Sequence, residues 1–106
     1  MRRVVERPVA VRELEGHAHY IARHDLDAAY RLLDAVERTY DMLLEMPEIG
    51  KRARAFTDPR LEGLRYLAVR GFRNYLVFYV YRRNEEVIEV RHILHGAQDI
   101  PRALRE

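Results

Sequence analysis

Apolar side chains recur along this chain with two different periods, and the change of period divides the sequence into two parts. Over residues 9–24 they return every three or four positions, and the same spacing continues over residues 26–47. This spacing predicts two amphipathic helices. With only one or two residues between them, the helices should pack as an antiparallel hairpin. Asp25 precedes the second helix and can cap its amino end.

Beyond Gly63 the apolar runs become short and rich in β-branched and aromatic residues, which indicates strands. Three such runs occupy residues 64–69, 75–81 and 87–94, and polar turns separate them. The middle run is apolar on both faces, as is typical of a central strand that is covered on each side. A fourth, short strand is predicted over residues 2–6, before Pro8, which suits the first turn of a helix.

These elements predict an α+β domain in the order β-α-α-β-β-β, with the helix hairpin packed on a small antiparallel sheet. The length of 106 residues fits a single domain over 1–106. The arginine-rich stretch from Lys51 through Thr57-Asp58-Pro59 is interpreted as an ordered loop. The tail, 101–106, is too short for an independent helix, and we expect it to order only against a partner. The pattern does not say what covers the second face of the sheet.

Composition narrows the possible chemistry. The chain has no cysteine, which excludes disulfides, thiolate metal sites and a cysteine nucleophile, and fits a reducing cytoplasm. Glu6 and Arg7 interrupt the basic amino end, and the longest apolar run is only 75–81, so we expect neither a secretion signal nor a membrane span. The formal charge of +2 does not indicate a nucleic-acid partner by itself, and sequence-specific nucleic-acid binding is not expected.

Histidines are the first candidates for acid–base chemistry. His92 and His95 are candidates for an acid and a base because imidazole in general titrates near neutrality, but three residues apart in a strand they point to opposite faces. We therefore expect His95 to form local hydrogen bonds and His92 to be packed or partner-facing. The remaining histidines do not share a helical face and are predicted to be surface residues, namely His17, His19 and His24. No catalytic residue, metal site or cofactor is expected.

Three tyrosines of the middle run admit two interpretations. Tyr75, Tyr79 and Tyr81 can stack on bases, as aromatic residues on sheets do in single-strand binders. In this interpretation the phosphates are held by Arg73, Arg82 and Arg91. Core packing is favoured, because a run that is apolar on both faces is what a central strand shows without any nucleic acid.

Short strings spread from end to end of the chain resemble the ParE branch of the ParE/RelE toxin superfamily. They are Tyr20-Ile21-Ala22, Ala28-Ala29, Leu44-x-x-Pro47-x-x-Gly50, Leu61-x-Gly63-Leu64-Arg65, Tyr75-Leu76-Val77-Phe78-Tyr79 and Arg91-His92-Ile93-Leu94-His95-Gly96-Ala97-Gln98-Asp99. The resemblance implies the toxin of a type II toxin–antitoxin operon, neutralised in a hetero-oligomer by a ParD-like antitoxin.

The branch of the superfamily decides the mechanism that the resemblance implies. RelE-like members are ribosome-dependent mRNA endonucleases, whereas characterised ParE-like members poison DNA gyrase. RelE-like toxins hold the phosphate partly with an arginine where this chain has Leu76, and Leu67 and Val69 lie near the places of their paired lysines. We therefore expect a gyrase poison that is not an enzyme, with an mRNA endoribonuclease as the alternative.

Two partner surfaces are predicted. The target-facing surface is expected at Arg73, Arg91 and His95, polar residues on the rim of the sheet. Arg91 and His95 belong to the stretch that matches the family's Arg-x-x-x-His-Gly pattern. The helix hairpin carries more apolar residues than one sheet contact can absorb, so some should face an antitoxin. The basic loop that follows is equally typical of a solvated surface or of a contact for an acidic tail. The expected antitoxin contacts are Leu14, Ile21, Leu32, Val36, Tyr40, Lys51, Arg52 and Arg54.

Overall fold

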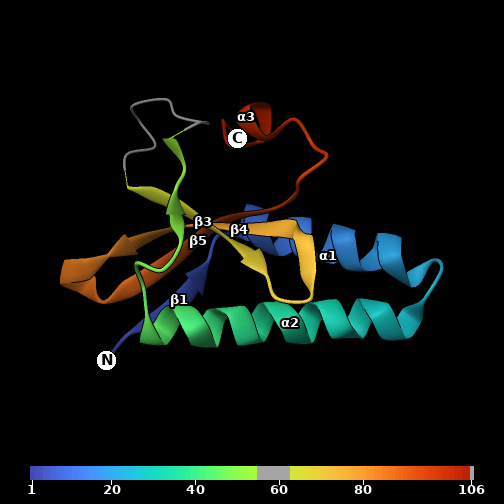
Figure 1. Ribbon diagram of the computed structural model, residues 1–106, viewed down its shortest axis with the longest axis horizontal. Helices are drawn as coiled ribbons and strands as arrows, with labels where there is room; N and C mark the ends of the chain where they lie inside the picture. The colour runs from blue at the N-terminus through green and yellow to red at the C-terminus, as the bar shows by residue number, and fades with distance from the viewer. Residues whose placement is uncertain (55–62, 106) are drawn as a thin grey trace.

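The computed structural model describes residues 1–54 and 63–105 and shows a two-helix hairpin packed on a five-stranded sheet (Figure 1). The elements in chain order are β1 (Arg3–Glu6), α1 (Pro8–Ala22), α2 (Leu26–Glu45), β2 (Lys51–Arg52), β3 (Leu64–Val69), β4 (Phe72–Arg82), the 3-10 turn η3 (Arg83–Glu85), β5 (Val87–His95) and α3 (Ile100–Ala103). The predicted α+β class and the order of its main elements are confirmed. Within the described ranges, no helix has the length and apolar character needed to cross a membrane. The predicted loop at Thr57-Asp58-Pro59 lies outside the described residues.

The sheet has the strand order β1-β5-β4-β3-β2, so β4 is central as its apolar run predicted. Strands β3, β4 and β5 form the expected antiparallel meander. However, β1 pairs with β5 in parallel, so the expectation of a purely antiparallel sheet is wrong. Because β3 and β5 are both antiparallel to β4, and β1 is parallel to β5, these three strands run in one direction. The two-residue strand β2, which pairs with β3, was not predicted.

The main core lies between the helix hairpin and one face of the sheet. Leu32, Val36 and Leu43 of α2 are buried there together with side chains from β4 and β5. Asp25 caps α2 as predicted, because its Oδ1 accepts a hydrogen bond from the Ala28 N–H at 3.0 Å. The cap fixes the point where the chain turns from one helix into the next.

The carboxyl-terminal segment covers the second face of the sheet. Figure 1 shows α3 across the sheet from α2, and Ile100 and Leu104 are buried there against β4 and β5 residues such as Phe78 and Leu94. Asp99 caps this single turn, accepting from the Arg102 N–H at 3.3 Å. The expectation that the tail orders only against a partner is therefore wrong, because the chain's own sheet supplies the apolar surface that a short helix needs.

Gly50 joins the helix hairpin to the sheet. Its N–H donates to Tyr79 Oη at 2.9 Å, and a Cβ at this position would lie 2.6 Å from the same oxygen. Any larger residue would therefore force the chain away from β4. The glycine of the Leu44-x-x-Pro47-x-x-Gly50 string is explained by this close approach.

Candidate functional site

The three residues predicted to face the target do not form one cluster. His95 ends β5 opposite Tyr75 of β4, and the exposed Arg73 lies two residues before Tyr75. Arg91 precedes His95 by four residues on β5, which is about 13 Å at the usual strand rise. Arg73 and His95 therefore share one end of the sheet, whereas Arg91 belongs to another part of it.

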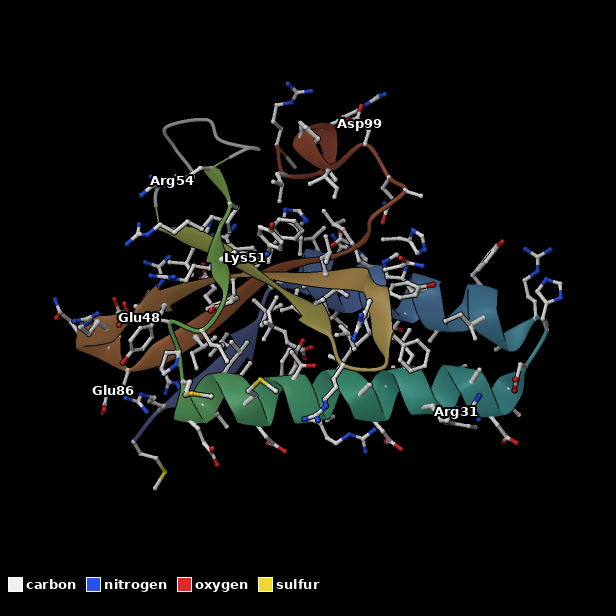
Figure 2. All side chains as sticks on the ribbon, viewed as in Figure 1. Arg31, Glu48, Lys51, Arg54, Glu86 and Asp99 are labelled. Atoms are coloured by element: carbon white, nitrogen blue, oxygen red, sulfur yellow. The ribbon has the colours of Figure 1, made fainter. Side chains whose placement is uncertain are left out.

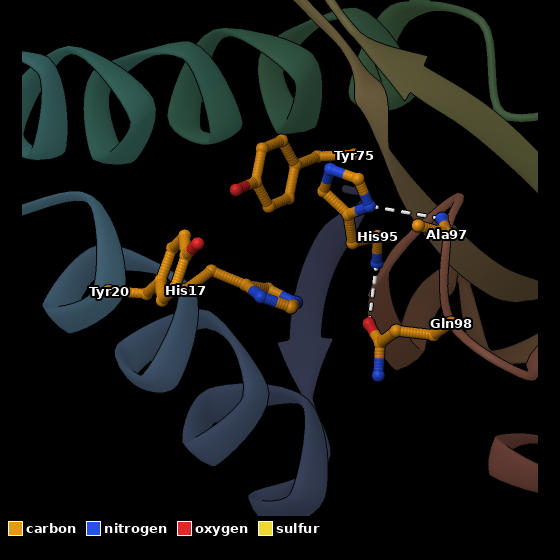
Figure 3. Close-up of a pocket in the computed structure, with 6 residues that line it drawn as sticks. All are labelled: His17, Tyr20, Tyr75, His95, Ala97 and Gln98. Carbon is orange, nitrogen blue, oxygen red and sulfur yellow. Dashed lines mark hydrogen bonds between the residues drawn. The ribbon is translucent and has the colours of Figure 1, made fainter.

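A pocket of about 470 Å³ opens beside His95 (Figure 3). Helix α1 contributes to it as much as the sheet does. Its lining consists of His17 and Tyr20 from α1, Tyr75 from β4, and His95, Ala97 and Gln98 from the end of β5 and the turn that follows. The sequence pattern did not predict that α1 residues line this pocket, because α1 and β5 are far apart in the sequence and come together only in the folded chain.

The turn after β5 fixes the orientation of His95. Its backbone N–H donates to Gln98 Oε1 at 2.6 Å, and its ring Nδ1 accepts from the Ala97 N–H at 3.0 Å (Figure 3). The predicted local bonding of His95 is confirmed. Because Nδ1 accepts, the neutral ring carries its proton on Nε2, and Nε2–H is the donor that His95 can offer to a ligand.

Tyr75 lies between two histidine rings. Its centroid is 5.0 Å from that of His17 and 4.8 Å from that of His95, and both contacts are edge-to-face. Burial, and to a smaller extent the neighbouring Tyr20, raise the pKa of Tyr75. The phenol therefore remains a hydrogen-bond donor at neutral pH, held in one orientation by the ring contacts.

Side chains of α1 replace a neighbouring strand at one point of β5. Strand β1 pairs with β5 only as far as Val90. Beyond it, Glu13 Oε1 accepts from the Ile93 N–H at 3.0 Å, and His17 Nε2 donates to the Ile93 carbonyl at 2.8 Å. His17 is therefore part of the site, and the prediction that it is a surface residue is wrong. His19 and His24 are exposed as predicted.

His92 is packed rather than partner-facing. Its ring Nδ1 lies 3.1 Å from Glu13 Oε2, and its side chain is buried. It pairs with Phe78, whose side chain belongs to the core under α3, whereas His95 pairs with Tyr75 on the helix side. The two histidines thus point to opposite faces as predicted, and only His95 reaches the pocket.

Three of the predicted antitoxin contacts lie inside the core. Leu32, Val36 and Tyr40 are buried between α2 and the sheet, so their predicted place on a partner-facing surface is wrong. The sheet is wide enough to cover this whole stripe of α2. Leu14 and Ile21 are partly buried against the same core.

The outward apolar residues of the hairpin are different ones. Tyr20, Leu26 and Tyr30 are 63%, 58% and 59% exposed near the connection between the helices. The Arg23 guanidinium lies 5.9 Å from the Tyr20 ring centroid, within the range of a cation–π contact. We refer to these three exposed large side chains near the end of the hairpin as the hairpin tip.

The basic members of the predicted antitoxin surface are exposed. They are Lys51, Arg52 and Arg54. Figure 2 shows Lys51 and Arg54 on the segment that leads away from α2, whereas Arg31 lies on α2 itself. The basic loop and the apolar hairpin tip are thus separate surfaces.

The three residues compared above with the phosphate-binding cations of RelE-like toxins are packed in the cores here. Leu76 packs against the core under α3 and lies opposite Leu94. Leu67 packs against the helix-side core, and Val69 is fully buried in it. In the part of the chain that the structure describes, no three histidine or carboxylate side chains gather where a metal ion could bind. The pocket itself offers hydrogen-bond donors from Tyr75 and His95.

A helix hairpin on this five-stranded sheet is the fold of the ParE/RelE class of toxins. A family model described as the ParE toxin of the type II toxin–antitoxin system, parDE, matches residues 4–100. The chain therefore belongs to the ParE toxin family, whose toxins are paired with an antitoxin, and the resemblance seen in the sequence motifs is confirmed. A comparison with curated proteins gave no match.

Proposed function

We propose that this toxin poisons DNA gyrase through protein–protein contacts in the cytoplasm, and that a ParD-like antitoxin neutralises it in a hetero-oligomer. The observation that carries the proposal is the packing of Leu76, Leu67 and Val69. Cleavage of RNA needs cations on the in-line phosphate, and apolar side chains occupy the places where RNA-cleaving relatives carry them. A mechanism that depends on contacts alone has no such requirement.

The histidines support the same conclusion. General acid–base cleavage needs two groups that reach one substrate. His92 is buried against Glu13, and one ring nitrogen of His95 is occupied by the Ala97 N–H. The endoribonuclease alternative would have to rely on His95 Nε2 and Tyr75, whose pKa is raised.

The surface proposed to face gyrase combines Arg73 with the pocket beside His95. Arg73 is exposed on β4, and the structure gives it no ion pair within the described ranges. An unpaired arginine beside a pocket lined by aromatic rings has the composition of an interface hot spot.

Purified gyrase provides the test. Wild-type toxin should trap gyrase-cleaved DNA, and Arg73→Gln should weaken this activity about tenfold. Arg12→Gln is the matched control, because Arg12 is also exposed but lies on α1. Equal activity of the three proteins would show that the gyrase contact lies elsewhere.

Translating ribosomes test the alternative. Primer extension on mRNA incubated with ribosomes and wild-type toxin should show no site-specific cuts. Cuts that His95→Gln abolishes, together with no trapped gyrase, would favour the endoribonuclease and overturn the proposal.

A further inference from the structure

Glu89 lies where arginines from three parts of the fold meet. Arg7 precedes α1, Arg82 ends β4, and Arg91 lies two residues after Glu89 on β5. Arg7 Nε and Arg82 Nη2 are 3.5 and 3.3 Å from Glu89 Oε1, and Arg91 Nε donates to the same oxygen. The side chains of Glu89 and Arg91 are only 17% and 20% exposed. Glu89 and the three arginines thus form a partly buried cluster at the protein surface.

The contacts leave donors available for a ligand. Arg7 and Arg91 both use Nε toward Glu89, and within the described ranges no partner is recorded for their terminal amino groups. A guanidinium holds its donors in a planar fork that matches phosphate or carboxylate oxygens. One carboxylate against three guanidiniums leaves a net charge of +2 in the cluster.

The backbone around the cluster also favours an anion. Tyr79 pairs with Val90 and Phe78 pairs with His92, so Arg91 occupies a β-bulge without a residue opposite. Bulges re-aim side chains and are frequent beside functional sites. Helix α1 starts directly after Arg7 with no side-chain cap and no acidic residue in its first turn, which leaves the positive end of its dipole uncompensated.

The carboxylate of Glu89 remains ionised and can hold the arginines in place. Burial alone would raise its pKa, but the hydrogen bond from Arg91 and the charges of Arg91, Arg7 and Arg82 together lower it. The neighbouring Glu6 accepts the Tyr40 hydroxyl at 2.7 Å, and within the described ranges the ion pairs of these arginines are with Glu89.

We propose that Arg7, Arg82 and Arg91 form a binding site for the phosphodiester backbone of a nucleic acid, without recognition of its bases. Polyanions are favoured over single carboxylates because the chain outside residues 8–45 carries 15 basic and nine acidic residues, a field that attracts repeated negative charge. Phosphate contacts of this kind position a protein along a strand. The site is distinct from the pocket proposed to face gyrase and does not depend on that assignment.

Fluorescence anisotropy with the full chain tests the proposal. The probes are a labelled DNA duplex, a single-stranded RNA of equal length and a polyglutamate peptide. Arg7→Gln and Arg91→Gln should each raise the Kd for nucleic acid about threefold to tenfold and reduce the salt slope by about 1. Arg38→Gln, an exposed arginine on α2, is the matched control and should change neither. The probe bound more tightly, DNA or RNA, identifies the source of the phosphates.

Three results would overturn the site. They are no binding of either nucleic acid, an equal loss in Arg38→Gln, and arginine-dependent binding of polyglutamate alone. Arg91 is partly buried, so Arg7→Gln decides the outcome if thermal melting shows that Arg91→Gln is unfolded. An Arg7→Gln toxin that loses nucleic-acid binding but still traps gyrase would separate this site from the proposed gyrase surface.

Discussion

The helix hairpin and the rest of the molecule carry opposite charge. Residues 8–45 contain four arginines and eight carboxylates, a net charge of −4, whereas the remaining residues contain 15 basic and nine acidic groups, a net charge of +6. The overall charge of +2 conceals this division. An acidic partner segment is therefore attracted to the sheet side and repelled from the helices.

This difference separates two kinds of contact that an antitoxin can make. At the hairpin, the exposed surface offers apolar anchors, Tyr20, Leu26 and Tyr30. On the sheet side, the exposed Lys51 and Arg52 suit acidic residues. We expect an antitoxin to bind the first surface through apolar burial, which salt does not screen, and the second through charge, which salt weakens.

The largest expected difference is in the free energy of unfolding, between replacement of a buried and of an exposed leucine of α2. Leu32→Ala removes a fully buried side chain and should lower the free energy of unfolding by about 2–5 kcal/mol. Leu26→Ala should change it by less than about 0.5 kcal/mol. Urea denaturation measures both values, and similar values for the two variants would contradict the assigned burial.

Variants of the exposed residues of α2 test the antitoxin assignment. Leu26→Ala and Tyr30→Ala should each weaken binding of an antitoxin peptide about tenfold or more while the toxin remains stable, because truncated apolar anchors cost affinity directly. Calorimetry at two salt concentrations measures this loss. Unchanged affinity in both variants would exclude the hairpin tip as the antitoxin surface.

Glu13 connects the two parts of the molecule, and its removal should have an intermediate effect. Glu13→Ala leaves the Ile93 N–H and the His92 ring without their acceptor. A loss of about 1–3 kcal/mol is expected for an unsatisfied buried donor. Glu15→Ala, at an exposed position two residues away, is the control. Hydrogen exchange at the Ile93 amide should accelerate only in Glu13→Ala, and equal exchange in both variants would show that the contact does not protect the strand.

Local periodicity was sufficient to predict most of the fold. The helices, the Asp25 cap and the three-strand meander follow from spacing and residue type, which act over a few positions. β2 was missed because two residues are too few to show a period. The tail was misjudged because the apolar surface that orders Ile100 and Leu104 comes from strands far earlier in the chain.

The candidate site was harder to predict than the fold. His95 and Tyr75 belong to adjacent strands, so their proximity follows from the meander. His17 is held at the same pocket by a hydrogen bond to Ile93, 76 residues later in the chain. The local sequence pattern of α1 does not predict this contact. The outward-facing residues of α2 could have been predicted from helix geometry. At 100° per residue, Tyr30 lies about 160° around the helix from Leu32 and therefore outside the buried stripe.

Replacement of Tyr40 should have a small effect on stability at neutral pH and a pH-dependent effect under alkaline conditions. Its hydroxyl donates to Glu6 Oε2 at 2.7 Å, so Tyr40→Phe should cost about 1 kcal/mol at pH 7. Burial, followed by the hydrogen bond to Glu6 and the charges of Glu6 and Glu37, raises the pKa of Tyr40 far above its usual value. The folded chain therefore keeps this proton at a pH where the unfolded chain releases it.

The sign of the pH dependence follows from that difference. Stabilisation by the neutral phenol is complete below the unfolded pKa of about 10 and is lost as the pH rises above it, by up to about 1.4 kcal/mol per pH unit. Tyr40→Phe lacks this loss, so the stabilities of the two proteins should converge above about pH 10. Tyr20→Phe, which alters an exposed ring, should follow the wild type throughout. Urea denaturation at a series of alkaline pH values measures the curves, and parallel curves for wild type and Tyr40→Phe would show that Tyr40 titrates alike in both states.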